Sequence, residues 1–349
     1  MSEMTTDATR DGTSDRAPVL EIENLRTRFD LEAGTVRPVD GVTFSIAPGE
    51  TVGLVGESGA GKSMTALSIL GLVPPPGRLE EGSRIRYTPP RNGPALELVG
   101  ATKSELRKLR GDRVAMIFQE PMTSLNPVQR VGAQIDEALR LHRGLDGAAA
   151  RSRSIGLLGE VGVPEPEARY RAYPHELSGG MRQRVMIAMA LACEPDLLIA
   201  DEPTTALDVT IQAQILDLLA SLQERHGMAI LLVTHDLAVV AEVCDRVMVM
   251  YGGQLVESGS VAEVFANPLH PYTRGLMDSL PTGDGRPLRP IPGRVPAAGE
   301  WPEGCRFAPR CRWAADRCAE PQQLVEVEDG RGTRCGRVSR GEIELEGLR

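Results

Sequence analysis

No uninterrupted apolar run in this chain of 349 residues approaches the length that crosses a bilayer. A membrane helix needs about 18 or more such residues, and the longest apolar run, near residues 229–233, suits a buried strand. Residues 1–18 are rich in Thr, Ser and Asp and contain no apolar stretch, so we expect no secretory signal there. These absences predict a soluble intracellular protein.

An excess of positive charge is also missing. The 39 basic and 48 acidic side chains leave a formal net charge of −9, which argues against a nucleic-acid partner held by bulk charge. Hydrophobic residues make up 41% of the chain and charged residues 25%. These values are typical of globular proteins and exclude disorder along the whole chain.

The chain divides into three predicted parts. Residues 1–17 cannot bury enough apolar surface to offset the entropy of ordering, so we expect a disordered tail. Residues 18–265 alternate strand and helix patterns, which is typical of a doubly wound, mainly parallel α/β sheet. Residues 266–349 are expected to form a small extension, because a linker with six prolines occupies residues 281–302. Residues 74–95, rich in Pro, Gly and Arg, are interpreted as a surface insertion.

Apolar periodicity locates the elements of the α/β part. Strands are predicted over residues 19–29, 41–46, 51–55, 196–200 and 228–234, and helices over residues 64–72, 128–141, 151–161, 181–192 and 209–225.

A glycine-rich loop follows the strand at 51–55 and precedes a helix. Its residues fit the pattern G-x-x-x-x-G-K-S: Gly56, Glu57, Ser58, Gly59, Ala60, Gly61, Lys62 and Ser63. Glycines let backbone amides wrap a phosphate chain, and the helix start adds its positive dipole end. Lys62 would neutralise the β- and γ-phosphates and Ser63 would bind Mg²⁺. A glycine-rich turn with an incidental lysine is the alternative, which the flanking strand and helix make less favourable.

A buried strand ends in two acidic residues, Asp201 and Glu202. Asp201 is placed to hold Mg²⁺ through water, as in P-loop NTPases, and Glu202 to polarise the attacking water as general base. An acidic pair at a strand end is usually a solvated cap, but a phosphate loop earlier in the chain favours catalysis. His235 ends the next strand, within reach of a γ-phosphate, although a lone histidine is more often structural.

A second glycine-rich helix start, Ser178-Gly179-Gly180, offers the same anion-binding chemistry. One protein has little need of two phosphate nests unless the second serves the nucleotide of a neighbouring subunit.

Together these motifs resemble an ABC transporter ATPase over about residues 19–265. The ordered set comprises residues 56–63, Gln119, residues 177–181, residues 197–202, residues 206–208 and His235. The resemblance implies a P-loop NTPase (RecA-like) core with an antiparallel β subdomain and a helical subdomain near residues 122–178. It also implies a head-to-tail dimer in which each ATP lies between one P-loop and the partner's Ser178 nest.

By the same resemblance, Gln119 would sense Mg²⁺ and water and link the ATPase to its permease. Asp208 would belong to the nucleotide site. Phe29 occupies the place of the aromatic residue that stacks on adenine, but it suits the core of an edge strand nearly as well. Every expected catalytic residue is present, so we expect ATP hydrolysis.

Three further stretches narrow the resemblance to the dipeptide, oligopeptide and nickel importer ATPases, in particular the first of two ATPase subunits (the dipeptide or oligopeptide "D" type). They are residues 110–127, 173–176 and 267–276. This resemblance implies a peripheral location at the cytoplasmic face of the cell membrane. It implies two integral-membrane permease subunits and, indirectly, an extracytoplasmic peptide-binding protein. It favours a related second ATPase subunit over a second copy of this chain.

Two points of function stay open at this stage. The identity of the solute stays open between a peptide, nickel and another small solute, because the ATPase does not contact the solute. A soluble ABC ATPase of repair or translation is the rival from another class; such proteins usually carry two cassettes or a long coiled-coil insertion, and one P-loop is visible here.

Four of the six cysteines lie in the last 50 residues: Cys305, Cys311, Cys318 and Cys335. A disulfide framework is not expected in a reducing compartment, and four thiolates suit either tetrahedral zinc or an iron–sulfur cluster. The spacing C-x5-C-x6-C-x16-C contains no C-x2-C knuckle and misses the common ferredoxin run. Resemblance to the C-terminal extension of peptide importer ATPases implies a [4Fe–4S] cluster, with Zn²⁺ or free buried thiols as the alternatives.

The surroundings of these cysteines lead to two further expectations. Four arginines interleave with the cysteines and would offset the negative charge of either metal site: Arg306, Arg310, Arg312 and Arg317. We also expect the cysteine site to lie far from the P-loop and to act as a structural staple. The alternative is a redox or metal sensor that gates the ATPase.

Overall fold

The computed structural model describes residues 17–32, 34–90, 93–119, 124–205, 207–280, 289–328 and 330–345. The predicted tail, apart from Ala17, lies outside these ranges, as do residues 120–123, 281–288 and Ala206 of the sequence patterns. Within the described ranges, no helix combines the length and apolar character that a bilayer crossing requires.

An eight-stranded sheet forms the centre of the molecule, in the order β12-β13-β11-β10-β3-β9-β8-β7. Five neighbouring strands run parallel: β10 (Arg246–Tyr251), β3 (Thr51–Val55), β9 (Ala229–Thr234), β8 (Leu197–Asp201) and β7 (Val114–Ile117). Every residue of β3, β8 and β9 is buried, which is why these strands are continuous apolar runs. The predicted α/β class is confirmed.

The C-terminal extension adds strands to this sheet. β11 (Gln254–Ser260) pairs antiparallel with β10 and with β13 (Arg331–Thr333), and β13 pairs with β12 (Val325–Glu328). The extension is therefore joined to the ATPase core by main-chain hydrogen bonds as well as by its linker.

A second sheet is largely antiparallel and has the order β2-β1-β5-β6, with β4 paired to β1. Its strands are β1 (Leu20–Leu31), β2 (Gly34–Ile46), β4 (Arg78–Leu79), β5 (Arg84–Tyr87) and β6 (Leu96–Glu97). The interpretation of residues 74–95 as a surface insertion was wrong, because β4 and β5 belong to this sheet. Ile85 and Tyr87 point into its core while their arginine neighbours are exposed, so only two residues carried the apolar signal.

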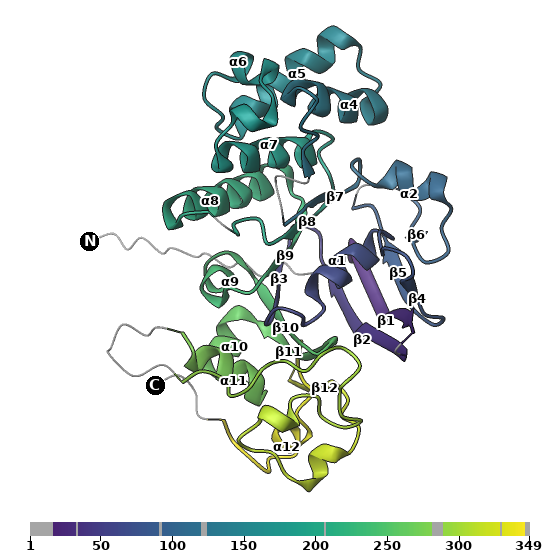
Figure 1. The fold of residues 1–349 in the computed structure, drawn as a ribbon, viewed down its shortest axis with the longest axis vertical. Coiled ribbons are helices and arrows are strands. Elements are labelled where there is room, and N and C mark those ends of the chain that lie inside the picture. Colours follow the sequence, from purple (N-terminus) through teal and green to yellow (C-terminus); the bar gives the residue numbers. More distant parts are fainter. Residues whose placement is uncertain are drawn as a thin grey trace, which may run out of the picture.

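Helices cover the sheets and build a separate lobe. The lobe contains α4 (Val131–Arg143), α5 (Gly147–Glu160), α6 (Pro166–Arg171) and α7 (Gly179–Leu191). Around the core lie α1 (Lys62–Ile69), α2 (Lys103–Leu109), α8 (Val209–His226) and α9 (Leu237–Val243), and the C-terminal part contains α10 (Val261–Ala266), α11 (Pro271–Asp278) and α12 (Gly336–Ser339). Figure 1 shows the helical lobe and the C-terminal extension at opposite ends of the molecule.

One apolar cluster joins the extension to the strand that leads into the phosphate loop. It contains Val55 at the end of β3, Tyr251 at the end of β10, and Tyr272 and Phe307 from the C-terminal part. The Phe307 ring centroid lies 5.3 Å from those of both tyrosines. This packing places the extension directly behind the phosphate loop.

Candidate functional site

The predicted phosphate loop connects β3 to α1, and its shape requires glycine at two positions. Gly56 has φ +156° and Gly61 has φ +105°. A Cβ at Gly56 would lie 2.2 Å from the Met250 carbonyl oxygen, and one at Gly61 would lie 2.1 Å from that of Pro38. Main chain from β2 and β10 therefore encloses the loop so closely that no side chain fits there.

Lys62, the first residue of α1, folds back over the loop. Its side chain is only 5% exposed, and Nζ donates to the carbonyl oxygens of Gly56 (2.7 Å) and Glu57 (3.2 Å). Burial lowers the pKa of Lys62, while the charges of Glu202, Asp201 and Glu57 oppose that shift. A buried cation over a ring of main-chain amides is the arrangement that receives a phosphate chain.

The structure brings together the two predicted Mg²⁺ ligands from α1 and β8. The Ser63 hydroxyl donates to Asp201 Oδ1 at 3.1 Å. Burial raises the pKa of Asp201 to about 6, although the hydrogen bond from Ser63 acts in the opposite direction. A hydroxyl and a buried carboxylate side by side are hard oxygen donors that suit Mg²⁺.

Glu202, the predicted general base, stands at the centre of a hydrogen-bonded group. Gln119 Nε2 donates to its Oε2 at 3.2 Å, Thr205 Oγ1 donates to the same oxygen at 2.7 Å, and His235 Nδ1 lies 3.3 Å from Oε1. Burial raises the pKa of Glu202, but the hydrogen bonds from Thr205 and His235 and nearby positive charge outweigh it, so the pKa lies below its usual value. The carboxylate is thus ionised, as a base must be.

Backbone strain holds this carboxylate in place. Glu202 has φ +47°, a left-handed conformation that costs a residue with a side chain about 1–3 kcal/mol and recurs at functional sites. Its amide donates to the Val233 carbonyl oxygen at 2.8 Å. Thr205 was not among the predicted site residues, because a threonine in a turn gives no pattern of its own.

A cavity of about 750 Å³ opens in front of these groups. It is lined by Gly56, Glu57, Ser58, Gln119, Glu202, His235, Leu276, Gly293, Arg294 and Val295. The last four come from the C-terminal part, which the sequence patterns had not placed near the nucleotide site. No periodicity or motif marks them, since they reach the cavity only through the tertiary fold.

The second predicted nest lies elsewhere on the surface. Ser178 caps α7 by accepting a hydrogen bond from the Met181 amide at 3.4 Å, and Ser178 and Gly179 are exposed. Asp208 caps α8 in the same way, accepting from the Ile211 amide at 3.0 Å. None of these residues lines the cavity at the phosphate loop.

Phe29 lies in β1, opposite Val36 of β2. Its ring packs against Gly77 so closely that a Cβ there would lie 2.5 Å from it. Phe29 is half-buried and does not line the cavity, so its predicted stacking on adenine stays a prediction.

The four C-terminal cysteines lie within electrostatic reach of one another. Burial raises the pKa of the Cys305 thiol to about 11 and that of Cys311 to about 12, with smaller contributions from the other cysteines. Nearby backbone amides, such as that of Phe307 for Cys305 and that of Trp313 for Cys311, oppose this rise in the pKa. Among the described residues, however, no group of three or more His, Cys, Asp or Glu is arranged to hold a metal ion.

The four interleaved arginines are already paired with carboxylates, so their role as a counter-charge to a metal site stays a prediction. Each forms an ion pair with a carboxylate: Arg306 with Asp40, Arg310 with Glu57, Arg312 with Asp278, and Arg317 with Glu342. The expected remoteness of the cysteine segment from the P-loop was wrong, because Glu57 belongs to the loop and Arg310 precedes Cys311.

Comparison with known proteins matches this geometry. Residues 39–205 match the family model for ABC transporters, and residues 256–318 match the one for the C-terminal region of oligopeptide/dipeptide transporters. A peptide import ATP-binding protein of Brucella abortus (strain 2308) is 52% identical over 330 residues, covering 92% of this chain and 97% of that protein. This chain belongs to the ABC transporter family. A peptide import ATP-binding protein of Brucella melitensis is 49% identical over 327 residues, covering 91% and 95% of the two chains.

Solved structures agree with membership of the ABC family. A dimeric ATP-binding cassette in a post-hydrolysis state with ADP and phosphate has a TM-score of 0.61 at 27% identity, covering 69% of this chain and 98% of that one. CbiO1 of Clostridium perfringens, part of an ABC transporter complex, has a TM-score of 0.58 at 29% identity, covering 71% and 91%. The chain is therefore an ABC ATPase, and the predicted resemblance and ATP-hydrolysing activity are confirmed.

Proposed function

We propose that this chain is the ATPase subunit that powers an importer of dipeptides or oligopeptides across the cytoplasmic membrane. The observation that carries the proposal is the union of a complete ATP site with an extension of the oligopeptide/dipeptide transporter type. That extension shares a sheet with the ATPase core and lines the nucleotide cavity. The names of relatives that cover almost the whole chain describe peptide import ATP-binding proteins.

ATP binds with its triphosphate on the loop 56–63, its Mg²⁺ at Ser63 and Asp201, and the attacking water at Glu202. Bound Mg²⁺ supplies charge neutralisation for the β- and γ-phosphates. Glu202 accepts the proton of the water, and Gln119 and His235 orient the Glu202 carboxylate. Lys62 stabilises the phosphate charge. The ring of Phe29 stacks on the adenine base.

The exposed nest at Ser178 completes the site of a second ATPase subunit. It is a helix start with free surface, built by the chain yet absent from its own cavity. In a head-to-tail pair, the Ser178 nest of each subunit would contact the ATP bound by the other subunit. The pair would close when ATP binds and reopen after hydrolysis. The partner is a related second ATPase of the same importer.

A groove beside Gln119 is the proposed contact with the permease at the cytoplasmic membrane face. Its cavity of about 290 Å³ lies between the segment that follows α1, the strand β7 and the helix α7, and is lined mostly by apolar side chains, Leu72, Phe118 and Met189 among them. Leu72 and Phe118 are 36% and 40% exposed, an apolar surface that suits a short permease helix. Movement there reaches Glu202 through Gln119.

The cysteines Cys305, Cys311, Cys318 and Cys335 are proposed to bind a [4Fe–4S] cluster. Four thiols in one small region and nearby backbone amides that favour the thiolate form support this, since such amides stabilise cluster thiolates. The side chains as described do not form a ready site for a metal ion, so loading would require them to rearrange. Iron, zinc and sulfide analysis of anaerobically purified protein separates the cluster from Zn²⁺ and from free thiols.

Reconstitution tests the transport proposal. The chain, its companion ATPase and their permeases are assembled in proteoliposomes with the binding protein, and phosphate release is measured with defined peptides or with Ni²⁺. We expect stimulation by peptides and none in the Glu202→Gln variant. Stimulation by Ni²⁺ alone would shift the solute class, and co-purification with ribosomes or DNA instead of permeases would overturn the importer.

A further inference from the structure

The side chain of Glu57, the second residue of the phosphate loop, is held by an arginine from the C-terminal extension. Arg310 Nη1 lies 2.7 Å from Glu57 Oε2, and Nη2 lies 3.0 Å from Oε1. This is a bidentate guanidinium–carboxylate pair, the strongest geometry for such a contact. The partners are 253 positions apart in the chain.

Arg310 is buried and held by contacts from three sides. It is 8% exposed, Nε donates to the Pro292 carbonyl oxygen at 2.9 Å, and Nη1 also lies 3.4 Å from the Tyr251 hydroxyl. A buried charge is stable only with its partner, so removing either member leaves the other uncompensated.

The main chain of Glu57 is held from the same side. Its amide donates to the Tyr272 hydroxyl at 2.8 Å, and Tyr272 is fully buried. The hydrogen of that amide is therefore already engaged by the tyrosine. Two residues outside the conventional ATPase core thus fix one residue of the loop by its side chain and by its backbone.

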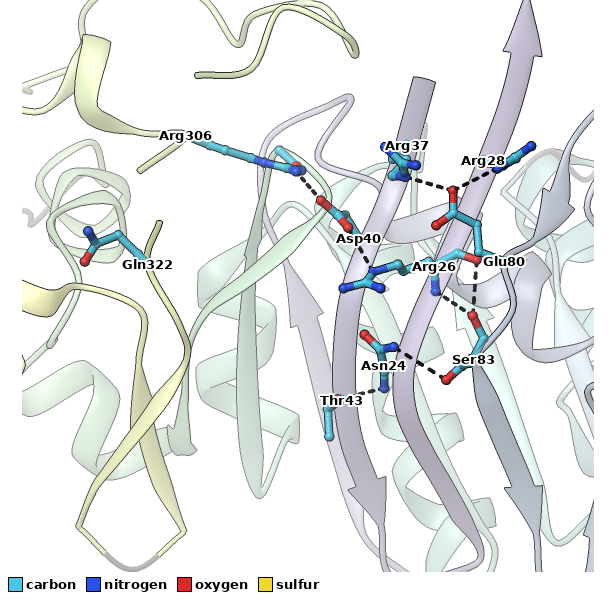
Figure 2. Close-up of polar contacts among 12 residues, drawn as sticks. Asn24, Arg26, Arg28, Arg37, Asp40, Thr43, Glu80, Ser83, Arg306 and Gln322 are labelled. Atoms are coloured by element: carbon cyan, nitrogen blue, oxygen red, sulfur yellow. Dashed lines mark hydrogen bonds and ion pairs between the residues drawn. The ribbon is translucent and has the colours of Figure 1, made fainter. Parts of the chain in front are cut away.

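The contact with Pro292 extends the connection to the cavity wall. Gly293, Arg294 and Val295 follow Pro292 and line the nucleotide cavity beside Glu57. The neighbouring arginine of the same segment, Arg306, contacts Asp40 of β2, which also pairs with Arg26 of β1 at 3.3 Å (Figure 2). The segment between Cys305 and Cys311 thus reaches both the phosphate loop and the antiparallel sheet.

We propose that Arg310 is a positioning residue of the ATP site, through which the C-terminal extension sets the affinity of the phosphate loop for ATP. Arg310 neutralises the Glu57 carboxylate and fixes its side chain against the extension. Without Arg310, an unpaired carboxylate on the loop repels the triphosphate that the loop must hold. The inference rests on the ATPase assignment and is independent of the solute and of any metal at the cysteines.

This mechanism makes an asymmetric prediction for the two members of the pair. Arg310→Met should raise the KM for MgATP about tenfold, since it exposes a charge that a strong hydrogen-bonded pair had masked. The kcat should change less than about twofold, because Glu202, Gln119 and His235 are untouched. Glu57→Gln should have a smaller effect, and adding it to Arg310→Met should restore most of the lost affinity, because the repelling charge is gone.

The experiment measures KM and kcat for MgATP on the full chain paired with its companion ATPase, with binding of radiolabelled ATP in a Glu202→Gln background as a second readout. Arg312→Met is the matched control: this arginine lies two positions away, pairs with Asp278 at 3.7 Å and has a side chain 53% exposed. Arg310→Lys keeps the charge without the bidentate contact and should recover part of the affinity. Melting temperatures identify variants that fail to fold.

Three results would overturn the proposal: an unchanged KM in a folded Arg310→Met protein, an equal rise in KM in Arg312→Met, or no recovery in the Glu57→Gln, Arg310→Met double variant. The last would mean that the loss of affinity does not come from the unpaired charge of Glu57. Failure of the protein to hydrolyse ATP at all would instead concern the ATPase assignment, so the two failures are distinguishable.

Discussion

The two glycine-rich helix starts of this chain, at Lys62 and at Gly179, share one chemistry but differ in what the chain supplies around them. The first is enclosed: Gly56 and Gly61 touch neighbouring main chain, and Lys62 is buried in the loop. The second is open: Ser178 and Gly179 are exposed, and a Cβ at Gly179 would meet only a Leu207 methyl, at 4.0 Å.

The glycines of the two nests therefore have different surroundings, close main chain at one and open surface at the other. In the phosphate loop the fold of the chain itself excludes a side chain. At Gly179 nothing within the described part of the chain does, so a side chain there would meet only what approaches this surface from outside. This contrast fits the proposal that one nest binds the chain's own ATP and the other meets the ATP of a second subunit.

The largest expected effect concerns chemistry at the enclosed nest. Glu202→Gln should lower turnover by about 10²–10⁴-fold, because the water loses its proton acceptor, while ATP binding is retained on the loop. Phosphate release and ATP binding measure the two quantities. Undiminished hydrolysis would remove Glu202 as the base.

A matched pair of alanine substitutions tests the contrast between the nests. Gly61→Ala forces a Cβ onto the Pro38 carbonyl oxygen at φ +105° and should destabilise the protein by about 3 kcal/mol. Gly179→Ala should change stability by less than about 0.5 kcal/mol yet lower turnover of the assembled ATPase pair. Denaturant unfolding measures the first effect and phosphate release the second. Equal destabilisation by both changes would break the comparison.

The support behind the enclosed nest should weaken in acid. His270 is buried at the start of α11, where Nδ1 accepts from the Tyr272 amide at 3.1 Å, and burial, helped by the charge of Arg334, lowers the pKa of His270 to about 3. The unfolded chain protonates this residue near pH 6.5 while the folded chain does not, so stability falls as pH drops below 6.5. At pH 5 the loss is about 2 kcal/mol.

The control for this pH effect is His270→Gln, which cannot titrate. Burial raises the pKa of nearby Glu257 to about 7, an effect of opposite sense that both proteins share and that cancels in the comparison. The difference in melting temperature between the two proteins should therefore change steadily between pH 7 and pH 5. A constant difference would contradict the burial of a neutral His270.

The smallest expected effects concern the caps of α7 and α8. Asp208→Ala removes a 3.0 Å hydrogen bond to the Ile211 amide and should cost about 1 kcal/mol of stability. Ser178→Ala removes a longer one, 3.4 Å, and should cost less. If Ser178 serves a second subunit, its substitution should nevertheless lower turnover of the pair more than its stability cost explains, which phosphate release and unfolding measure together.

Local patterns predicted the parts of this site that lie within one strand, loop and helix. The loop 56–63 and the acidic pair Asp201-Glu202 each follow a buried strand, so residue type and context coincide in a short window. Arg310 and Tyr272 reach Glu57 from 253 and 215 positions away, and such contacts leave no periodic trace. The apolar pattern did not predict β5, because this strand buries only Ile85 and Tyr87, which alternate with exposed arginines.

Ser178 is proposed to act on the nucleotide of another subunit, while Lys62 acts on the nucleotide of its own chain. The most direct measurement is sedimentation of the Glu202→Gln chain with MgATP, alone and with its companion ATPase. We predict ATP-dependent pairing that Ser178→Arg abolishes although the chain still binds ATP. Pairing that survives Ser178→Arg, or loss of ATP binding by the separate Ser178→Arg chain, would contradict the account.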